Sequence, residues 1–232
     1  IRKVQEVFGQ FATPEVARLV VEGPDTLFKW GELRNVTVLF ADVRSFTPFV
    51  QRVPPEEAVL SLNEILAYVI DSVRSEGGIV NKFMGDGVMA VFGAPVRHDD
   101  HAGAAARTAL RARRSVETLA NMRRALKMES LRLGFALNSG NVVAGCIGTR
   151  ERTEYSVIGH PVNLAARLES VAAPGQIIVG PETARLLEGR FSVAPLAAMR
   201  LAGIPEPVSV AELVGISGVG GAWPAAPAGG RC

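Results

Sequence analysis

The sequence predicts a mixed α/β (α+β) domain with a ferredoxin-like βαββαβ core, followed by extra C-terminal strands and a helix. Apolar, β-branched runs alternate with segments of helical periodicity, in the order strand, helix, two-stranded hairpin, helix, strand. The chain has 232 residues, of which 48% are hydrophobic, so it is long enough to bury one sizeable core. We therefore expect one large domain, with or without appendages.

The N-terminal part of the chain supplies the first strand and the first helix of this core. The run VTVLF before Asp42 is apolar and β-branched, which predicts a buried strand. A helix that packs on the sheet should begin at Pro54-Pro55-Glu56, because apolar residues then recur at helical spacing. They are Val59, Leu62, Ile65, Leu66, Val69 and Ile70. Farther upstream, Thr13-Pro14-Glu15 predicts the start of a short helix that ends near Val21.

The rest of the core follows in sequence. Two short apolar runs are flanked by Gly77-Gly78 and Gly85-Asp86-Gly87, which predicts a β-hairpin with a tight turn. The longest helix should span residues 98–127, and LRLGFALNSG and NVVAGCIG then predict two strands joined at Ser139-Gly140-Asn141. Later elements are a strand at 155–158, a helix at 162–171, a strand at 177–179, a helix at 181–187, and strands near 191–193 and 208–213.

Composition excludes several classes of protein. The net charge of +2 is too small to indicate binding to nucleic acid or to an anionic membrane. No apolar stretch is long enough to span a bilayer and no signal peptide is present, so we expect no membrane contact by this chain. Cys146 and Cys232 match no metal-ligand spacing and favour a reducing, cytoplasmic location. Because the chain begins with Ile1, we expect it to be a piece of a longer protein, soluble or membrane-bound.

Two acidic residues carry most of the functional information. Asp42 follows the first strand, beside an expected loop at 43–48 whose N–H groups face an anion, and Asp86 lies in the hairpin turn. A fold that brings them together makes a site for hard cations, because Mg²⁺ prefers carboxylate oxygens together with the phosphates of its substrate. Asp86 alone is more often a turn former. Its pairing with Asp42 is what favours a functional role.

Of two further polar segments, one can bind an anion and the other is better explained as the start of a helix. In EYSVIGHPVNLAARLES, Asn163 and Arg167 stand four residues apart on one helix face, which can reach an anion. The alternative is a surface arginine with a polar neighbour. The segment His98-Asp99-Asp100-His101 has the look of a metal site, but it starts the long helix. Acidic residues there cap free N–H groups, so we expect no ligand role.

Three ordered motifs resemble the class III nucleotidyl (adenylyl/guanylyl) cyclase catalytic domain, bacterial adenylyl cyclase type: FADVRSFT, KFMGDGVMAVFGAP and YSVIGHPVNLAARLES. The resemblance implies the class III cyclase fold, with a connecting segment at 1–34, the catalytic domain at 35–214 and a flexible tail at 215–232. It also implies two divalent cations, Mg²⁺ or Mn²⁺, held by Asp42, Asp86 and the backbone carbonyl of Val43. Phe46 and Thr47 match the phosphate-binding loop of the family.

The resemblance also implies how the substrate is read. Lys82 matches the purine-reading position, and a lysine suits the adenine N1 acceptor because it only donates. Ser156 matches the second base-reading position, where a hydroxyl discriminates less because it both donates and accepts. Asn163 and Arg167 match the residues that orient the ribose and neutralise the α-phosphate. The implied reaction converts ATP to 3′,5′-cyclic AMP and pyrophosphate.

Family members work as head-to-tail homodimers, in which one chain supplies the metal-binding aspartates and the other supplies the remaining site residues. The lead-in FGQFATPEVARLV is similar to the segment that precedes the domain in bacterial members, which implies fusion to an upstream regulatory or sensor domain. One departure is that Ala202 and Ile204 stand where the family has lysines for the terminal phosphates, and Arg200 is the nearby substitute. Two alternatives therefore stay open, a catalytically weak regulatory nucleotide-binding module and a guanylate cyclase.

Overall fold

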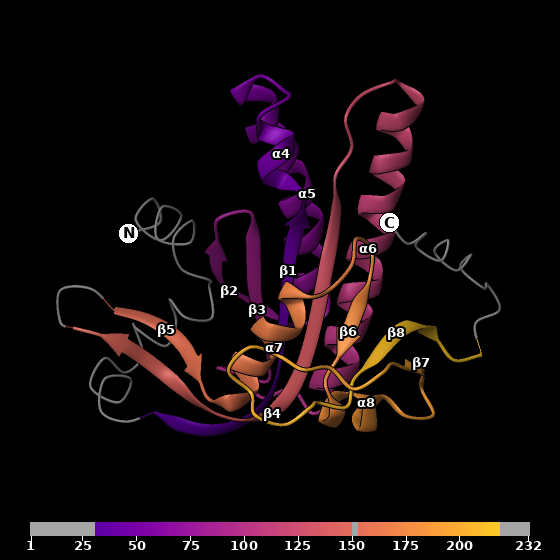
Figure 1. Cartoon of the computed structure of the whole chain (residues 1–232). Helices are drawn as coiled ribbons and strands as arrows, with labels where there is room; N and C mark the ends of the chain where they lie inside the picture. The colour runs from indigo at the N-terminus through magenta and orange to yellow at the C-terminus, as the bar shows by residue number, and fades with distance from the viewer. Residues whose placement is uncertain (1–30, 150–152, 219–232) are drawn as a thin grey trace.

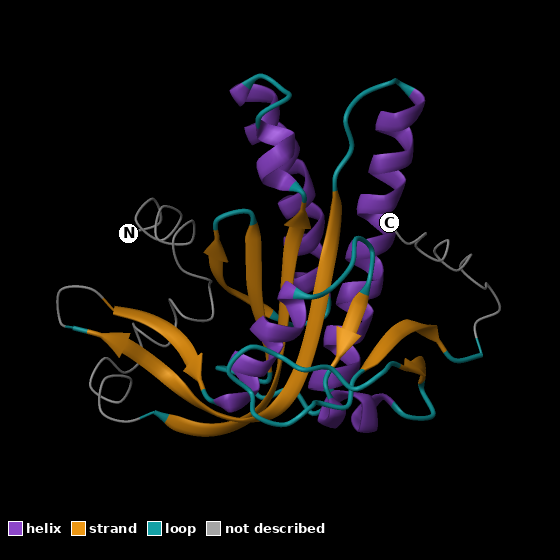
Figure 2. Ribbon diagram, viewed as in Figure 1, coloured by secondary structure: helices purple, strands orange, loops and turns teal. Residues whose placement is uncertain are grey.

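The computed structural model describes residues 31–149 and 153–218. Within them the chain forms one eight-stranded sheet with helices on both faces (Figures 1 and 2). The strands are β1 (Glu32–Arg44), β2 (Ile79–Met84), β3 (Gly87–Phe92), β4 (Arg132–Gly148), β5 (Thr153–Ile158), β6 (Ile177–Val179), β7 (Phe191–Pro195) and β8 (Ala211–Ile216). The helices are α4 (Phe46–Val50), α5 (Pro55–Ser75), α6 (His101–Ala125), α7 (His160–Ser170) and α8 (Pro181–Leu187).

The predicted ferredoxin-like core is confirmed by the order of the strands. The first four lie in the order β2-β3-β1-β4, and every neighbouring pair is antiparallel. The helices α5 and α6 make the two crossovers, from β1 to β2 and from β3 to β4. The sheet then continues through β6, β8 and β7, while β5 pairs with the far end of β4.

The predicted break at Ser139-Gly140-Asn141 is wrong, because β4 is one strand of 17 residues. It pairs with β1 without interruption, from Arg44 opposite Arg132 to Glu32 opposite Ala144. Asn141, which looked like a turn residue, instead accepts a cross-strand hydrogen bond from Nδ2 of Asn35 at 2.9 Å. Pairing with a distant strand has overridden a local turn signal.

The two faces of the sheet are buried by different helices. Alternate residues of β1, Leu39, Ala41 and Val43, pack with α5 and α6 in the largest cluster of the core. The intervening residues Val38 and Phe40 lie on the opposite face, in a cluster that includes Ala165 of α7. In Figure 1, α7 accordingly lies across β4 and β1 in front of the sheet, with α5 and α6 behind it. Asp42 and Arg44 have the same parity as Phe40, so they belong to the α7 face.

Most of the predicted helices are confirmed, but their first residues or their buried faces differ from the prediction. The helix α5 begins at Pro55 as expected, but Val59 is 58% exposed because the buried stripe runs through Ala58, Ile65 and Val69. The helix α6 begins at His101 instead of residue 98. The helix expected from Thr13 and most of the expected tail, residues 219–232, lie outside the described residues. Over the part of the chain that is described, no helix is long and apolar enough to cross a membrane.

Candidate active site

The two aspartates come together at one end of the β1–β3 pair. Asp42 is directly opposite Gly87, the residue that follows Asp86, and Asp86 occupies the two-residue turn of the β2–β3 hairpin. Gly85 takes the left-handed conformation that this turn needs, with φ of 67°. Burial raises the pKa of the Asp42 carboxyl, and the negative charge of Asp86 raises it further. The two carboxylates are therefore close enough to repel each other.

Glycines lie opposite Asp42 on both neighbouring strands. On β3, a Cβ at Gly87 would lie 2.8 Å from Asp42 Oδ1, and on β4 the residue opposite Asp42 is Gly134. A side chain at Gly87 would therefore crowd the Asp42 carboxylate. Two neighbouring carboxylates supply the oxygen ligands that a hard divalent cation prefers, so the donor set fits such an ion.

The segment after Asp42 differs from the expected loop at 43–48. The strand β1 continues through Val43, whose side chain is buried on the α5 and α6 face, and ends at Arg44. A single residue, Ser45, then turns the chain with φ of 60° and ψ of 31° into the short helix α4. Phe46 stacks on Phe49 at 6.1 Å between ring centroids, and Thr47 is exposed. The apolar contact of the two rings explains why a helix replaces the loop.

A basic residue that the sequence reasoning missed joins Asp42 to α7. Nη2 of Arg44 lies 3.3 Å from Asp42 Oδ2 and also forms an ion pair with Oε1 of Glu169 on α7. The Arg44 side chain crosses β4 above Gly134, where a Cβ would lie 2.5 Å from its Nε. The sequence signal was present, because residues two apart on a strand share a face.

The two predicted base-reading residues also come together. Ser156 on β5 is 3% exposed, and its hydroxyl donates to Oδ1 of Asn81 at 3.1 Å. Nδ2 of Asn81 in turn donates to the carbonyl of Tyr155 at 2.8 Å, which fixes the orientation of the amide. Asn81 precedes Lys82, whose Nζ pairs with Glu154 Oε1 at 2.9 Å.

Sequence reasoning missed Asn81 and Glu154. The register of β2 against β3 shifts between Val80 and Lys82, and this irregularity turns Asn81 toward β5. No local pattern in the sequence marks such a shift. Its effect is that Asn81, Lys82, Glu154 and Ser156 form one polar group across β2 and β5.

Asn163 and Arg167 line one cavity of about 540 Å³, which confirms that they share a face of α7. The opposite side of α7 is buried through Leu164, Ala165 and Leu168. Across the cavity lies the segment 202–205, which includes Ala202 and Ile204, so the departure from the lysine pattern falls at this cavity. The exposed residue Arg200 precedes that segment, outside a regular strand, and does not line the cavity.

Among residues 31–149 and 153–218, no hydrogen bond or ion pair joins Asp42 or Asp86 directly to Asn163 or Arg167. The connection between the two groups runs through Arg44 and Glu169. One chain therefore presents an acidic group at the end of β1 and a second polar surface on α7.

Comparison with known proteins identifies the family of this chain. A family model described as the adenylate and guanylate cyclase catalytic domain matches residues 28–211. The chain belongs to the class III adenylyl and guanylyl cyclase family. Two uncharacterized proteins of Mycobacterium tuberculosis are similar to this cyclase domain. Rv1318c is 36% identical over 93% of this chain and 39% of its own length, and Rv1320c is 38% identical over 79% and 31%.

The solved structures that are similar to this chain include both adenylyl and guanylyl cyclases. The adenylyl cyclase CyaB from P. aeruginosa has a TM-score of 0.75 and 30% identity, covering 79% of this chain and 95% of its own. The guanylyl cyclase Cya2 has a TM-score of 0.76 and 32% identity, covering 82% and 96%. The family and the class III cyclase fold are thus established, and the chain spans less than half the length of the mycobacterial relatives.

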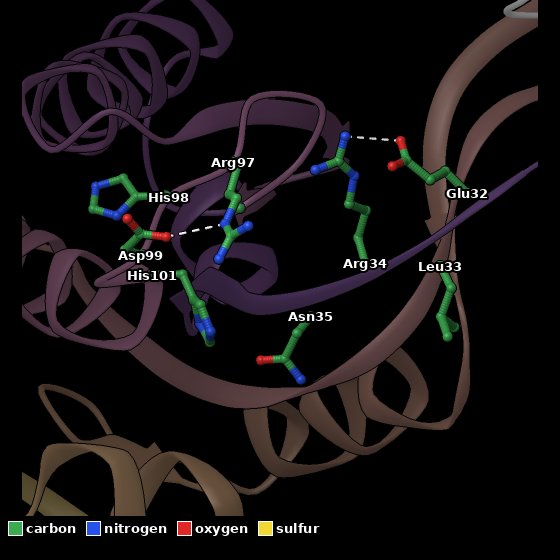
Figure 3. A pocket seen from close by; sticks show the side chains of 9 residues that line it. Glu32, Leu33, Arg34, Asn35, Arg97, His98, Asp99 and His101 are labelled. Atoms are coloured by element: carbon green, nitrogen blue, oxygen red, sulfur yellow. Dashed lines mark hydrogen bonds and ion pairs between the residues drawn. The ribbon is translucent and has the colours of Figure 1, made fainter.

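A second pocket of this cyclase domain contains the segment that looked like a metal site. The pocket, of about 360 Å³, is lined by residues that include Arg34, His98, Asp99 and His101 (Figure 3). Asp99 pairs with Arg97 at 3.0 Å, and Nδ1 of His101 lies 2.7 Å from the Thr37 hydroxyl.

The neighbouring Asp100 behaves as the sequence predicted. Its carboxylate accepts from the backbone N–H of Gly103 and so caps α6. The same carboxylate pairs with Arg107 and Arg190, at 3.0 and 2.7 Å. Within the described part of the chain, no group of three or more His, Cys, Asp or Glu side chains is arranged to hold a metal ion.

Proposed function

We propose that this cyclase domain is an adenylate cyclase that converts ATP to 3′,5′-cyclic AMP and pyrophosphate. The observation that carries the choice of ATP is the hydrogen bond from Ser156 to Asn81. Because the hydroxyl proton of Ser156 is committed to Oδ1 of Asn81, the free lone pairs of Ser156 act as an acceptor. An acceptor beside the donor Lys82 complements adenine, whose N6 amino group donates and whose N1 accepts.

The acidic group at the end of β1 fits the divalent cations of the proposed reaction. Asp42, Asp86 and the backbone carbonyl of Val43 would hold Mg²⁺ or Mn²⁺. When bound, the cations supply positive charge that lowers the pKa of the attacking hydroxyl and offsets charge on the leaving group. Burial and the negative charge of Asp86 both raise the pKa of Asp42, and the nearness of the two carboxylates supports this assignment because together they attract a cation.

The side chains on α7 would act on the ribose and on the reacting phosphate. Asn163 orients the ribose so that its 3′ oxygen faces the α-phosphorus, and Arg167 donates to the equatorial oxygens as their charge grows. The 3′-oxygen–phosphorus bond forms as the bond to pyrophosphate breaks, and the hydroxyl proton leaves to solvent. Phe46 and Thr47 would lie beside the terminal phosphates. Since Ala202 and Ile204 bring no charge to the cavity, we expect a high KM for ATP.

We also propose that the active sites form between two chains arranged head to tail. Asp42 and Asp86 of one chain would face Lys82, Asn163 and Arg167 of the second. The lack of a direct polar contact between these groups within the described chain supports this arrangement.

We place the catalytic domain at 35–214, between a connecting segment and a tail. The chain spans 39% of the length of Rv1318c, which supports fusion to a regulatory or sensor domain; we propose that this domain lies upstream and that the protein is cytoplasmic.

One observation favours GTP as a second candidate. Glu154 lies 2.9 Å from Lys82 and presents an acceptor beside the base-reading position. A carboxylate suits the N1–H and N2–H donors of guanine. If Lys82 stayed paired with Glu154 when the nucleotide bound, the pair would present both a donor and an acceptor.

The test is to incubate the purified chain with ATP or GTP and Mn²⁺ and to identify the products by chromatography. Cyclic AMP and pyrophosphate should form from ATP, and Asp86→Ala should abolish both. A chain that binds ATP but forms neither cyclic nucleotide, at concentrations where it is dimeric, would be the regulatory nucleotide-binding module instead.

A further inference from the structure

The guanidinium of Arg44 lies between two carboxylates with different surroundings. Asp42 belongs to the acidic group at the end of β1, and Glu169 belongs to α7, two residues after Arg167. Both the Arg44 and the Glu169 side chains are largely buried, with 17% and 15% exposure. An ion pair with so little water around it interacts more strongly than one on the surface.

The two carboxylates are the polar partners of the Arg44 guanidinium among the described residues. Nη2 pairs with both Asp42 and Glu169, whereas Nε is buried without a hydrogen-bond partner. A change at either carboxylate therefore acts on the same nitrogen. Gly134 keeps the path open, because any side chain there would collide with Nε of Arg44.

Arg44 supplies positive charge to the acidic group, because its Nη2 lies 3.3 Å from Asp42 Oδ2. A divalent cation bound to Asp42 would take over this role and would repel the guanidinium. Glu169 already pairs with the same nitrogen, so the guanidinium would release Asp42 and keep Glu169.

Resting on the proposed function, we infer that Arg44 is a positioning residue that releases Asp42 and keeps Glu169 when metal binds, so that metal binding at β1 fixes α7. The helix α7 also carries Asn163 and Arg167. Metal binding in one half-site is then linked to the position of the α7 side chains, which in a head-to-tail dimer serve the other site. Arg44 acts through Glu169 and touches neither nucleotide nor metal.

The test is direct Mn²⁺ binding to the full chain without nucleotide, measured by the electron paramagnetic resonance signal of free Mn²⁺. In Arg44→Ala the competing cation is gone, so the Kd for Mn²⁺ should fall about threefold to tenfold. In Glu169→Gln the guanidinium has only Asp42 left, so the Kd should rise by a similar factor. The double variant should match Arg44→Ala, because Glu169 acts only through Arg44.

The turnover number should fall in a variant whose affinity for Mn²⁺ rises. Arg44→Ala should bind Mn²⁺ more tightly and yet lose at least about tenfold in kcat, because α7 is no longer held. Arg44→Lys, which keeps the charge, should recover part of the kcat and return the Kd toward the wild-type value. A purely structural role would weaken metal binding and turnover together.

Controls separate this inference from the proposed function. Arg34→Ala removes an ion pair with Glu32 on the same strand, 2.8 Å long, and should leave the Kd for Mn²⁺ unchanged. Asp42→Asn should abolish tight Mn²⁺ binding, and if it does not, the metal site itself is wrong. If Asp42→Asn behaves as expected but folded Arg44→Ala, checked by circular dichroism, binds Mn²⁺ no better than wild type, the role of Arg44 is overturned.

Discussion

Among the single residues, Asn81 gives the proposed base-reading serine, Ser156, a way to select between purines. A free hydroxyl rotates to donate or to accept, and so it fits either purine. The bond from Ser156 to Oδ1 of Asn81, together with the bond from Nδ2 to the Tyr155 carbonyl, leaves only the acceptor role. If Lys82 and Ser156 read the base as proposed, specificity depends on Asn81, next to Lys82, as well as on Lys82 itself.

Replacing Asn81 by alanine should free the Ser156 hydroxyl to donate to guanine O6. We expect the ratio of kcat/KM for ATP to that for GTP to fall about tenfold, the cost of about one hydrogen bond. Asn35→Ala is the matched control, since Asn35 also makes a cross-strand bond to an asparagine but far along β1. An unchanged ratio in Asn81→Ala would refute the acceptor assignment of Ser156.

Lys82→Glu tests the other half of the base-reading pair. It removes the donor for adenine N1, adds a second carboxylate beside Glu154, and should shift the preference away from ATP. Kinetics with both nucleotides measure the shift. If selectivity stayed as in the wild type, Lys82 would not contact the base.

Ser45 carries backbone strain that glycine would relieve. Its φ of 60° is costly for a residue with a Cβ, and its side chain makes no capping bond to α4. Ser45→Gly should therefore raise the free energy of unfolding by about 0.5–1 kcal/mol, after the gain in unfolded-state entropy is subtracted. Urea denaturation measures the difference, and a destabilised variant would mean that the hydroxyl has a role that the structure does not display.

At the scale of elements, the parts of the site that could be predicted are those fixed by local pattern. The hairpin that carries Asp86 and the helix that carries Asn163 and Arg167 both follow from periodicity and turn residues. The uninterrupted β4, the α4 helix and the shift that turns Asn81 toward β5 depend on pairing with distant residues. Arg44 and Glu169 are 125 positions apart, and only the folded sheet reveals their contact.

The hairpin that holds Asp86 should be sensitive at Gly78. A Cβ there would lie 2.3 Å from the ring of Phe92, which is fully buried, so Gly78→Ala must displace a core side chain. We expect a loss of about 1–3 kcal/mol in stability, as for other overpacked cores. Gly215→Ala meets nothing within 4 Å and is the control in the same thermal melts. Equal melting temperatures for the two variants would contradict the packing described.

In the molecule as a whole, one chain carries two separate polar regions: the acidic group of Asp42 and Asp86, and the α7 surface with Asn163 and Arg167. The acidic end of β1 and the α7 surface are joined by one arginine, and the base-reading group lies across β2 and β5. If sites form between chains, a mixture of Asp42→Ala and Arg167→Ala chains should regain up to about a quarter of wild-type activity, because one of the two sites in each mixed dimer is intact. No recovery in a mixture shown to exchange subunits would exclude shared sites.

We expect the proposed base-reading residues to make this cyclase domain select ATP. The most direct measurement gives the purified wild-type chain equal concentrations of ATP and GTP in one reaction with Mn²⁺ and quantifies both cyclic nucleotides by mass spectrometry. The bond that commits the Ser156 proton to Asn81 predicts that cyclic AMP dominates the product. A product that is mainly cyclic GMP would refute the selection of ATP and would assign the base-reading role to Glu154.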